Sequence, residues 1–268
     1  MSILRSLAFT LGTSGLSIFA SNLSATNTTD RIIGKNDLVK VPASYANDHR
    51  MQAIGLMELG CTVTHVGRGI AITAGHCFAS SNFQGVKKNL PCSESKYSIH
   101  WGYLEGVDSY LTSQCTNIIA TELNSERDYA IFRVSSIPDG FIDVNGATAA
   151  IGDDISIYSH PKKRTLEWSN WCKVEGLISK SNGNQFYYSC DTEPGSSGAA
   201  VLDSNDRIVG IHNYYNGPLD RNGATLITKT PLIDLLTGSF PTNDFNPRSR
   251  FLRTFAAPSI HSLLSSVQ

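Results

Sequence analysis

Short apolar runs divided by polar turns fill the central part of the sequence. Between Ile32 and Thr230 these runs are rich in β-branched and aromatic residues, and clusters of Gly, Asn, Asp and Pro separate them. Such runs predict β-strands, and no helical spacer of about 10–15 residues lies between them, so we expect an all-β barrel or sandwich. The predicted strands are Met51–Glu58, Cys61–Val66, Ile70–Thr73, Ser98–Tyr103, Asn117–Glu122, Tyr129–Val134, Ile155–Tyr158, Trp171–Ile178, Phe186–Ser189, Ala199–Leu202, Ile208–His212 and Ala224–Thr228.

The two ends of the chain follow other patterns. Residues 231–238 have the sequence of a short closing helix that ends at a glycine, and residues 239–268, rich in Ser, Pro, Asn and Arg, are interpreted as a tail. Near the N-terminus, Arg5 precedes an apolar stretch to Ala20 and then small residues up to Ala25. This order predicts a secretory signal peptide over residues 1–25, and an ordinary disordered or helical N-terminus is the alternative.

Composition and charge exclude several classes of protein. The chain has 268 residues, of which 41% are hydrophobic and 17% charged, so it can bury one large core or two modest ones and is neither disordered nor fibrous. The 22 Lys and Arg residues nearly balance the 23 Asp and Glu residues, which leaves no surplus of cations for a nucleic-acid backbone. No apolar stretch reaches the roughly 18 residues of a membrane span. We therefore expect neither nucleic acid nor a membrane as a partner.

The cysteines of the chain favour the same export route. There are six, none of them in a Cys-x-x-Cys pair, and an even number without such pairs favours disulfides over zinc or a redox dithiol. Pairing of nearest neighbours in the sequence would give Cys61–Cys77, Cys92–Cys115 and Cys172–Cys190, and buried reduced thiols are the alternative.

A histidine turn follows one of the predicted strands. Ile70–Thr73 runs into a small-residue turn that presents His76, and the next residue is Cys77. A disulfide from Cys77 to Cys61 would tether this turn to the preceding strand, and a general base must be held within about 3 Å of the proton it takes. His76 is thus a candidate general base, with a structural or surface histidine as the alternative.

An acid and a serine provide two further candidates. Asp128 opens a strand that would place it at the mouth of a core, where a carboxylate can hold an imidazole in one tautomer, although an Asp at a strand end is often only a cap. Ser197 lies between Ser196 and Gly198 in a Gly-x-Ser-Gly turn before an apolar strand. Such a turn can expose one hydroxyl and converge backbone N–H groups, although Gly/Ser-rich turns are common in β proteins.

The three motifs together resemble a known family. They occur in the order TAGHC, DYAIFRV and PGSSGAAVLD, and over about Ile32–Gly238 the chain is similar to the chymotrypsin-like serine peptidases. It resembles in particular the secreted bacterial branch that includes the glutamyl endopeptidases, whose mature chains begin much like IIGKND and continue to a paired-cysteine segment like Cys172–Cys190. The resemblance implies two six-stranded antiparallel β-barrels, about 32–140 and about 141–238, with a short C-terminal helix and an active site between them.

The resemblance also implies an activity. The chain would be a secreted serine endopeptidase, extracellular or periplasmic, that acts on proteins or peptides without a metal or cofactor, and we expect a monomer. Ser197 would attack the peptide carbonyl, His76 would take and return the proton, Asp128 would hold the imidazole, and the N–H groups of Gly195 and Ser197 would form the oxyanion hole. A catalytically silent binding protein of the same fold is the alternative, against which the intact triad argues.

The residue before the nucleophile predicts a different activation from that of the trypsin-like animal enzymes. Those enzymes carry an Asp directly before the nucleophile, and this Asp pairs with the new N-terminus after zymogen cleavage. This chain has Ser196 at that position. Activation through that salt bridge is therefore not expected. The Arg31–Ile32 bond still has the form of a site for a trypsin-like cut, so we expect residues 26–31 to be a short pro-segment and residues 32–238 to be the peptidase domain.

Two features predict opposite substrate preferences. Asp191 lies six residues before Ser197, where trypsin-like enzymes place the acid that binds Arg or Lys. Thr192 and His212 match positions that bind the substrate carboxylate in glutamyl endopeptidases, and a His with a hydroxyl partner suits an anionic side chain. We favour an acidic residue before the cleaved bond, with a turn carboxylate and a satisfied barrel histidine as the structural alternatives for Asp191 and His212.

Overall fold

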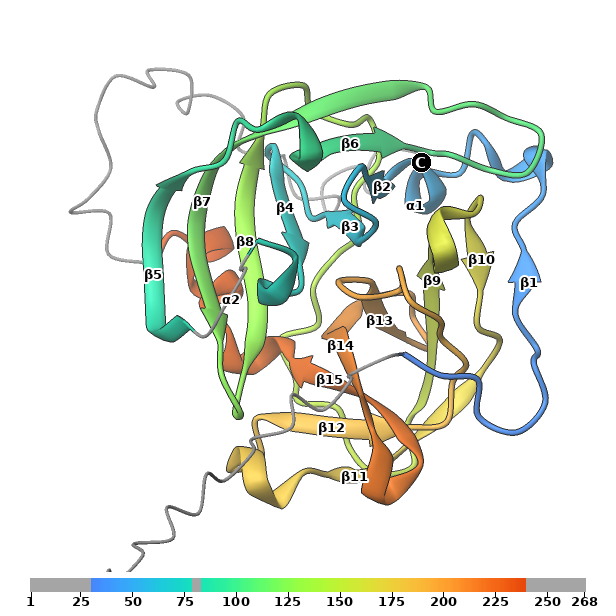
Figure 1. Cartoon of the computed structure of the whole chain (residues 1–268), viewed down its shortest axis with the longest axis vertical. Helices are drawn as coiled ribbons and strands as arrows, with labels where there is room; N and C mark the ends of the chain where they lie inside the picture. Colours follow the sequence, from blue (N-terminus) through green and yellow to red (C-terminus); the bar gives the residue numbers. More distant parts are fainter. Residues whose placement is uncertain (1–29, 79–82, 240–268) are drawn as a thin grey trace, which may run out of the picture.

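Two closed β-barrels lie side by side in the structure, a computed structural model that describes residues 30–78 and 83–239 (Figure 1). The predicted signal peptide, most of the predicted pro-segment and the tail after Ser239 lie outside the described residues. Among the helices that the structure describes, none is long and apolar enough to cross a membrane.

The first barrel contains six strands in a closed antiparallel ring. These are β2 (Ile54–Met57), β3 (Thr62–His65), β4 (Ile70–Thr73), β6 (Ser98–Trp101), β7 (Leu111–Leu123) and β8 (Asp128–Val134). They pair in the order β7-β6-β2-β3-β4-β8, and a pairing of β7 with β8 closes the ring. A further strand, β5 (Phe83–Pro91), lies on the outside against β7.

The second barrel repeats this arrangement. Its strands are β9 (Asp154–Ser159), β11 (Cys172–Leu177), β12 (Gln185–Tyr188), β13 (Ala200–Asp203), β14 (Ile208–Asn216) and β15 (Arg221–Leu226). They pair in the order β9-β11-β12-β15-β14-β13, and β13 pairs with β9 to close the ring. Two short strands, β10 (Glu167–Trp168) and β1 (Val39–Lys40), extend the sheet beyond β9. The expected fold of two six-stranded antiparallel barrels is confirmed.

The apolar pattern locates the strands correctly but not every strand end. Each of the twelve predicted strands overlaps one barrel strand. The run Met51–Glu58 is wrong at its start, because Met51 belongs to a short helix, α1 (His49–Gln52), whose first turn is capped by the side chain of Asp48. The predicted closing helix is present as α2 (Leu232–Thr237) and ends at Gly238 in the left-handed conformation.

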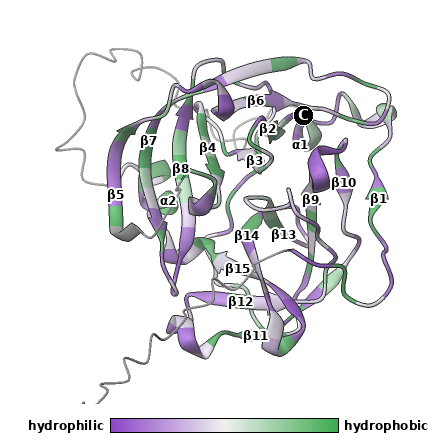
Figure 2. Cartoon of the chain, viewed as in Figure 1, coloured by the Kyte–Doolittle hydropathy of each residue, from purple (hydrophilic) through white to green (hydrophobic). Residues whose placement is uncertain are grey.

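The barrels share an apolar core in addition to their own interiors. On β4, Ala71 lies in the interior of the first barrel, while Ile70 and Ile72 belong to a cluster that also contains Leu202 and Ile211 from the second barrel. Alternate residues of a strand point to opposite faces, so β4 is apolar on both faces, and Figure 2 colours it as hydrophobic while much of β5 is hydrophilic. Burial of this shared face holds the two barrels together.

Phe132 gives a direct test of the first barrel's interior. Its side chain is fully buried and packs edge-on against Phe78 at a ring separation of 5.1 Å. We expect Phe132→Ala to lower the free energy of unfolding by about 3–5 kcal/mol, measured by urea denaturation, because it removes apolar contacts and leaves a cavity. Phe141→Ala is the matched control, since Phe141 is 52% exposed and its loss should change the free energy by less than about 1 kcal/mol. Equal losses in the two variants would contradict this packing.

Candidate active site

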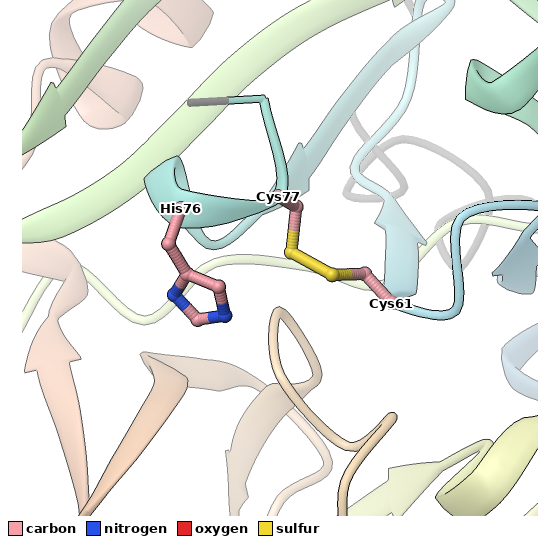
Figure 3. A group of neighbouring side chains, drawn as sticks. All are labelled: Cys61, His76 and Cys77. Carbon is pink, nitrogen blue, oxygen red and sulfur yellow. A yellow bond between two sulfur atoms is a disulfide. The ribbon is translucent and has the colours of Figure 1, made fainter. Parts of the chain in front are cut away.

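The candidate base His76 stands on a stapled turn at the end of β4. It lies in a short 3₁₀ turn, η2 (Gly75–Cys77), and the next residue is bonded to Cys61 just before β3 in a disulfide (Figure 3). The predicted Cys61–Cys77, Cys92–Cys115 and Cys172–Cys190 bonds are all present. The ligand atoms of Cys61, His76 and Cys77 lie within 4.8 Å of one another, but metals bind the thiolate form of cysteine and both sulfurs here belong to the disulfide. The group is therefore a stapled histidine turn rather than a metal site.

Asp128 holds the histidine by two hydrogen bonds. Its Oδ2 lies 2.7 Å from His76 Nδ1, and its Oδ1 accepts the backbone N–H of His76 at 3.0 Å. The ring that donates from Nδ1 has its Nε2 lone pair available to accept a proton. Residues of the second barrel fix the acid in turn: the N–H of Asp128 donates to Thr225 Oγ1, and Asn213 Nδ2 donates to its carbonyl. The orientation of His76 thus depends on both barrels.

The surroundings of His76 raise its pKa. Burial lowers the pKa of the imidazole, but the charge of Asp128 and its hydrogen bond outweigh that effect, and the nearby carboxylate of Asp30 adds to the increase. The side chain is nevertheless 34% exposed, so a substrate can reach it. The protonated ring persists to a higher pH than that of an ordinary histidine.

The candidate nucleophile Ser197 lies in a loop that needs two glycines. Gly195 and Gly198 have φ angles of +108° and +90°, which L side chains rarely adopt. A Cβ atom on Gly198 would lie 1.9 Å from Thr73 Oγ1, and one on Gly195 would lie 2.6 Å from the carbonyl oxygen of His160. The glycines therefore permit the close approach of the Ser197 loop to both barrels.

The same loop presents two backbone N–H groups. Within the described residues, the N–H groups of Gly195 and Ser197 donate to no acceptor. The carbonyl of Pro194 accepts the N–H of Lys162, and because the peptide bonds of the described residues are all trans, the Gly195 N–H points the opposite way. Backbone N–H groups without a partner beside the nucleophile are what an oxyanion hole requires.

A set of ion pairs holds the loop that carries Lys162. Glu193, just before Pro194, pairs with both Lys162 and Arg164, and Arg164 also pairs with Glu167. These contacts lower the pKa of Glu193, in spite of its partial burial, and keep it charged. The orientation of the Pro194–Gly195 peptide is thereby tied to β10.

Thr62 connects the nucleophile loop to the first barrel. Its backbone N–H donates to the carbonyl of Ser197 at 2.9 Å, and its hydroxyl donates to the carbonyl of Gly195 at 2.8 Å. The hydroxyl also accepts the N–H of His160 at 3.0 Å. One fully buried side chain thus joins β3, the nucleophile loop and the loop that supports it.

Ser196 is buried beside the nucleophile. Its hydroxyl lies 2.9 Å from that of Ser159 and accepts the N–H of Glu193 at 3.2 Å. A neutral hydroxyl in these contacts cannot form an ion pair with an amino group.

The hydroxyl of Ser197 faces a carboxylate that the motifs do not include. It donates to Asp30 Oδ2 at 3.3 Å, and among the described residues no hydrogen bond joins it to His76. The other carboxylate oxygen of Asp30 lies 3.0 Å from His212 Nε2, at ion-pair distance. Asp30 therefore lies between the nucleophile and His212.

His212 and Thr192 lie in the same buried region. Both are fully buried, and the hydroxyl of Thr192 has no partner among the described residues. The pKa of Tyr188 lies far above its ordinary value, chiefly because of burial, so its phenol stays protonated, and it lies 2.6 Å from His212 Nδ1. The Tyr188 hydroxyl also donates to the carbonyl of Gly223 at 3.4 Å, and the other ring nitrogen of His212, Nε2, faces the carboxylate of Asp30.

Asp191 binds the chain itself. Its Oδ1 accepts the N–H of Ile33 at 2.7 Å, and its Oδ2 accepts the N–H of Asp37 at 2.9 Å. Both oxygens of this buried carboxylate are thus engaged with the segment that leads to β1.

Comparison with known proteins identifies the family of the chain. Residues 60–211, more than half of the chain, match the trypsin-like peptidase domain. The chain belongs to the trypsin-like peptidases. No curated protein matches its sequence.

Solved structures share the fold of this trypsin-like peptidase. A Glu endopeptidase solved in complex with MPD superimposes with a TM-score of 0.61 at 21% identity, covering 78% of this chain and 98% of that one. The inactive form of the Rv3671c protease gives 0.50 at 15% identity, covering 74% and 97%. At these identities the likeness concerns the fold.

Sequence motifs miss three residues of this trypsin-like peptidase site. Thr62 follows a cysteine of the predicted staple, but its contacts arise from loops about a hundred or more residues away. Tyr188 lies in a predicted strand without any signal of its contact with His212. Asp30 offers a weak signal, because it directly precedes Arg31, after which the cut is expected.

The Thr62 junction can be tested against a neighbour on the same strand. Thr62→Val should lower the free energy of unfolding by about 1–3 kcal/mol, because it leaves the Gly195 carbonyl and the His160 N–H buried without partners. Thr64→Val is the matched control, since Thr64 is equally buried and its hydroxyl has no partner in the described part of the chain. Thermal unfolding should show the loss in the first variant and little change in the second. A Thr62→Val protein as stable as Thr64→Val would contradict the junction.

Proposed function

We propose that this chain is a secreted serine endopeptidase that hydrolyses peptide bonds through Ser197, His76 and Asp128 and an acyl-enzyme intermediate. The observation that carries the proposal is the double hydrogen bond between His76 and Asp128, close to a serine loop with two unoccupied N–H groups. The three disulfides support an extracellular or periplasmic location, because such bonds persist in oxidising compartments.

Each group has a defined step in the proposed reaction. Ser197 Oγ attacks the peptide carbonyl as its proton passes to His76 Nε2, and the N–H groups of Gly195 and Ser197 receive the oxyanion. The protonated His76, stabilised by Asp128, then gives the proton to the leaving amine. Water next attacks the acyl-enzyme by the same route, which releases the acid and restores Ser197.

We further propose an acidic side chain before the cleaved bond. His212 Nε2 already lies at ion-pair distance from a carboxylate, that of Asp30, and the buried Thr192 hydroxyl has no hydrogen-bond partner among the described residues, which suits the two groups to bind a substrate carboxylate. An Arg or Lys substrate would instead need the carboxylate of Asp191, and both oxygens of that residue are engaged by Ile33 and Asp37.

Labelling with a fluorophosphonate tests the proposed activity. In the purified chain without its predicted pro-segment, the probe should modify Ser197, and mass spectrometry should locate it there. Ser197→Ala should abolish labelling and lower kcat by about 10⁶-fold, and His76→Ala should cause a similar loss, because the triad acts as a unit. Labelling that fails in the folded, processed protein would favour the silent binding protein instead.

The same assay has an expected pH dependence. The neutral form of His76 accepts the proton, and Asp128 raises its pKa, so the rate should rise with pH through a pKa above the ordinary histidine value of about 6.5.

A set of peptides that differ only before the cleaved bond tests the specificity. Glu should exceed its uncharged isostere Gln by about tenfold or more in kcat/KM, because only the carboxylate forms a charge-assisted hydrogen bond with His212. Thr192→Val should reduce this ratio. Faster cleavage after Arg than after Glu would contradict the assignment and favour Asp191 as the specificity residue.

A further inference from the structure

The chain places one of its own carboxylates in the centre of the candidate active site. Asp30 is the first residue that the structure describes. Its side chain is only 1% exposed and contacts Ser197 Oγ at 3.3 Å and His212 Nε2 at 3.0 Å. One side chain therefore touches both the proposed nucleophile and the proposed specificity residue.

The next residue holds Asp30 in this position. The carbonyl of Arg31 accepts hydrogen bonds from Thr192 N at 3.1 Å and from Asn222 Nδ2 at 2.6 Å, and its N–H donates to Asn222 Oδ1 at 3.2 Å. Its guanidinium lies 4.7 Å from the centre of the Tyr215 ring and donates to the hydroxyl. Contacts to three separate segments of the second barrel thus fix the residue that follows Asp30.

The chain is held independently on the other side of the Arg31–Ile32 bond. Asp191 binds the N–H groups of Ile33 and Asp37. A cut between Arg31 and Ile32 would leave this anchor intact and free only the part that carries Asp30. Arg31 itself is exposed, so a peptidase that cuts after arginine can reach it.

The position of Asp30 opposes the proposed chemistry in two ways. Its carboxylate accepts the Ser197 hydroxyl hydrogen that His76 must receive. It also fills the space in front of His212, where the acidic side chain of a substrate would bind. The charge of Asp30 further favours the protonated form of His76, which cannot act as a base.

We infer that Asp30 is a built-in inhibitor of this peptidase, whose carboxylate occupies the place of an acidic substrate side chain until the segment ending at Arg31 is removed. The inference rests on the proposed function. Removal is a hydrolysis: one water molecule adds across the Arg31–Ile32 peptide bond, which leaves a carboxylate on Arg31 and an amino group on Ile32. Because Ser196 offers no carboxylate to that amino group, activation here consists of clearing the site.

The experiment compares the rate at which a fluorophosphonate modifies Ser197 in cut and uncut chains. The uncut chain retains Asp30, the cut chain is treated with trypsin, and intact mass separates the two species and confirms a cut only at Arg31. The uncut chain is made as wild type, Asp30→Ala and Asp30→Asn. Asp37→Asn is the matched control, because it removes one carboxylate from the segment just after the cut, which does not contact Ser197.

The expected order of rates is specific. The cut chain should react about ten- to hundredfold faster than the uncut wild type, the factor that a hydrogen bond to a charged group contributes. Uncut Asp30→Ala should react nearly as fast as the cut chain. The rate of uncut Asp30→Asn should lie between those of Asp30→Ala and wild type, since asparagine removes the charge and keeps the size. Asp37→Asn should react no faster than wild type.

Two results would overturn the inference while leaving the proposed function intact. One is an uncut wild type that reacts as fast as the cut chain. The other is a fast cut chain combined with an uncut Asp30→Ala that stays as slow as wild type, which would show that the carboxylate is not the block. A cut chain that folds but never reacts would instead refute the proposed function, and the inference with it.

Discussion

The candidate site depends on a junction between two barrels that each close upon themselves. A closed barrel satisfies its own strand hydrogen bonds, so the shared apolar core and polar contacts outside the two rings fix one barrel against the other. Thr62 supplies three of these contacts at the point where the Ser197 loop meets β3. Asp128, in the first barrel, makes further contacts with the second barrel: Thr225 and Asn213 hold the backbone of this acid, which orients His76. The site is therefore defined by the relative position of the barrels.

Local sequence predicts the parts of the structure that depend on local properties. Strands such as β4 are recognisable because a run of β-branched residues is buried on both faces, and His76 and Ser197 lie in turns with small residues on either side. The edge strands β1 and β5 escape detection, because an edge needs little apolar surface, and β10, between β1 and β9, is only 2 residues long. The apolar side chain of Met51 fits a strand or a helix pattern, and the cap from Asp48 decides for a helix.

Contacts between distant segments lie beyond such patterns. Nothing near Asp30 in the sequence indicates that it meets Ser197, which is 167 residues away. For Asp191, conversely, the sequence position suggests a contact that the fold does not make. An acid six residues before a nucleophile has a familiar role in one branch of the family, yet here its oxygens bind the backbone of Ile33 and Asp37. The role of a carboxylate is decided by the donors that the fold brings to it.

The disulfides have a consequence for the order in which the chain can assemble. Cys61–Cys77 and Cys92–Cys115 lie wholly within the first barrel, and Cys172–Cys190 lies within the second. During synthesis the N-terminal end appears first, so the four cysteines of the first barrel become available before either cysteine of the second. Each barrel can complete its own oxidation with partners already present, so vectorial synthesis itself limits mispairing between the two halves.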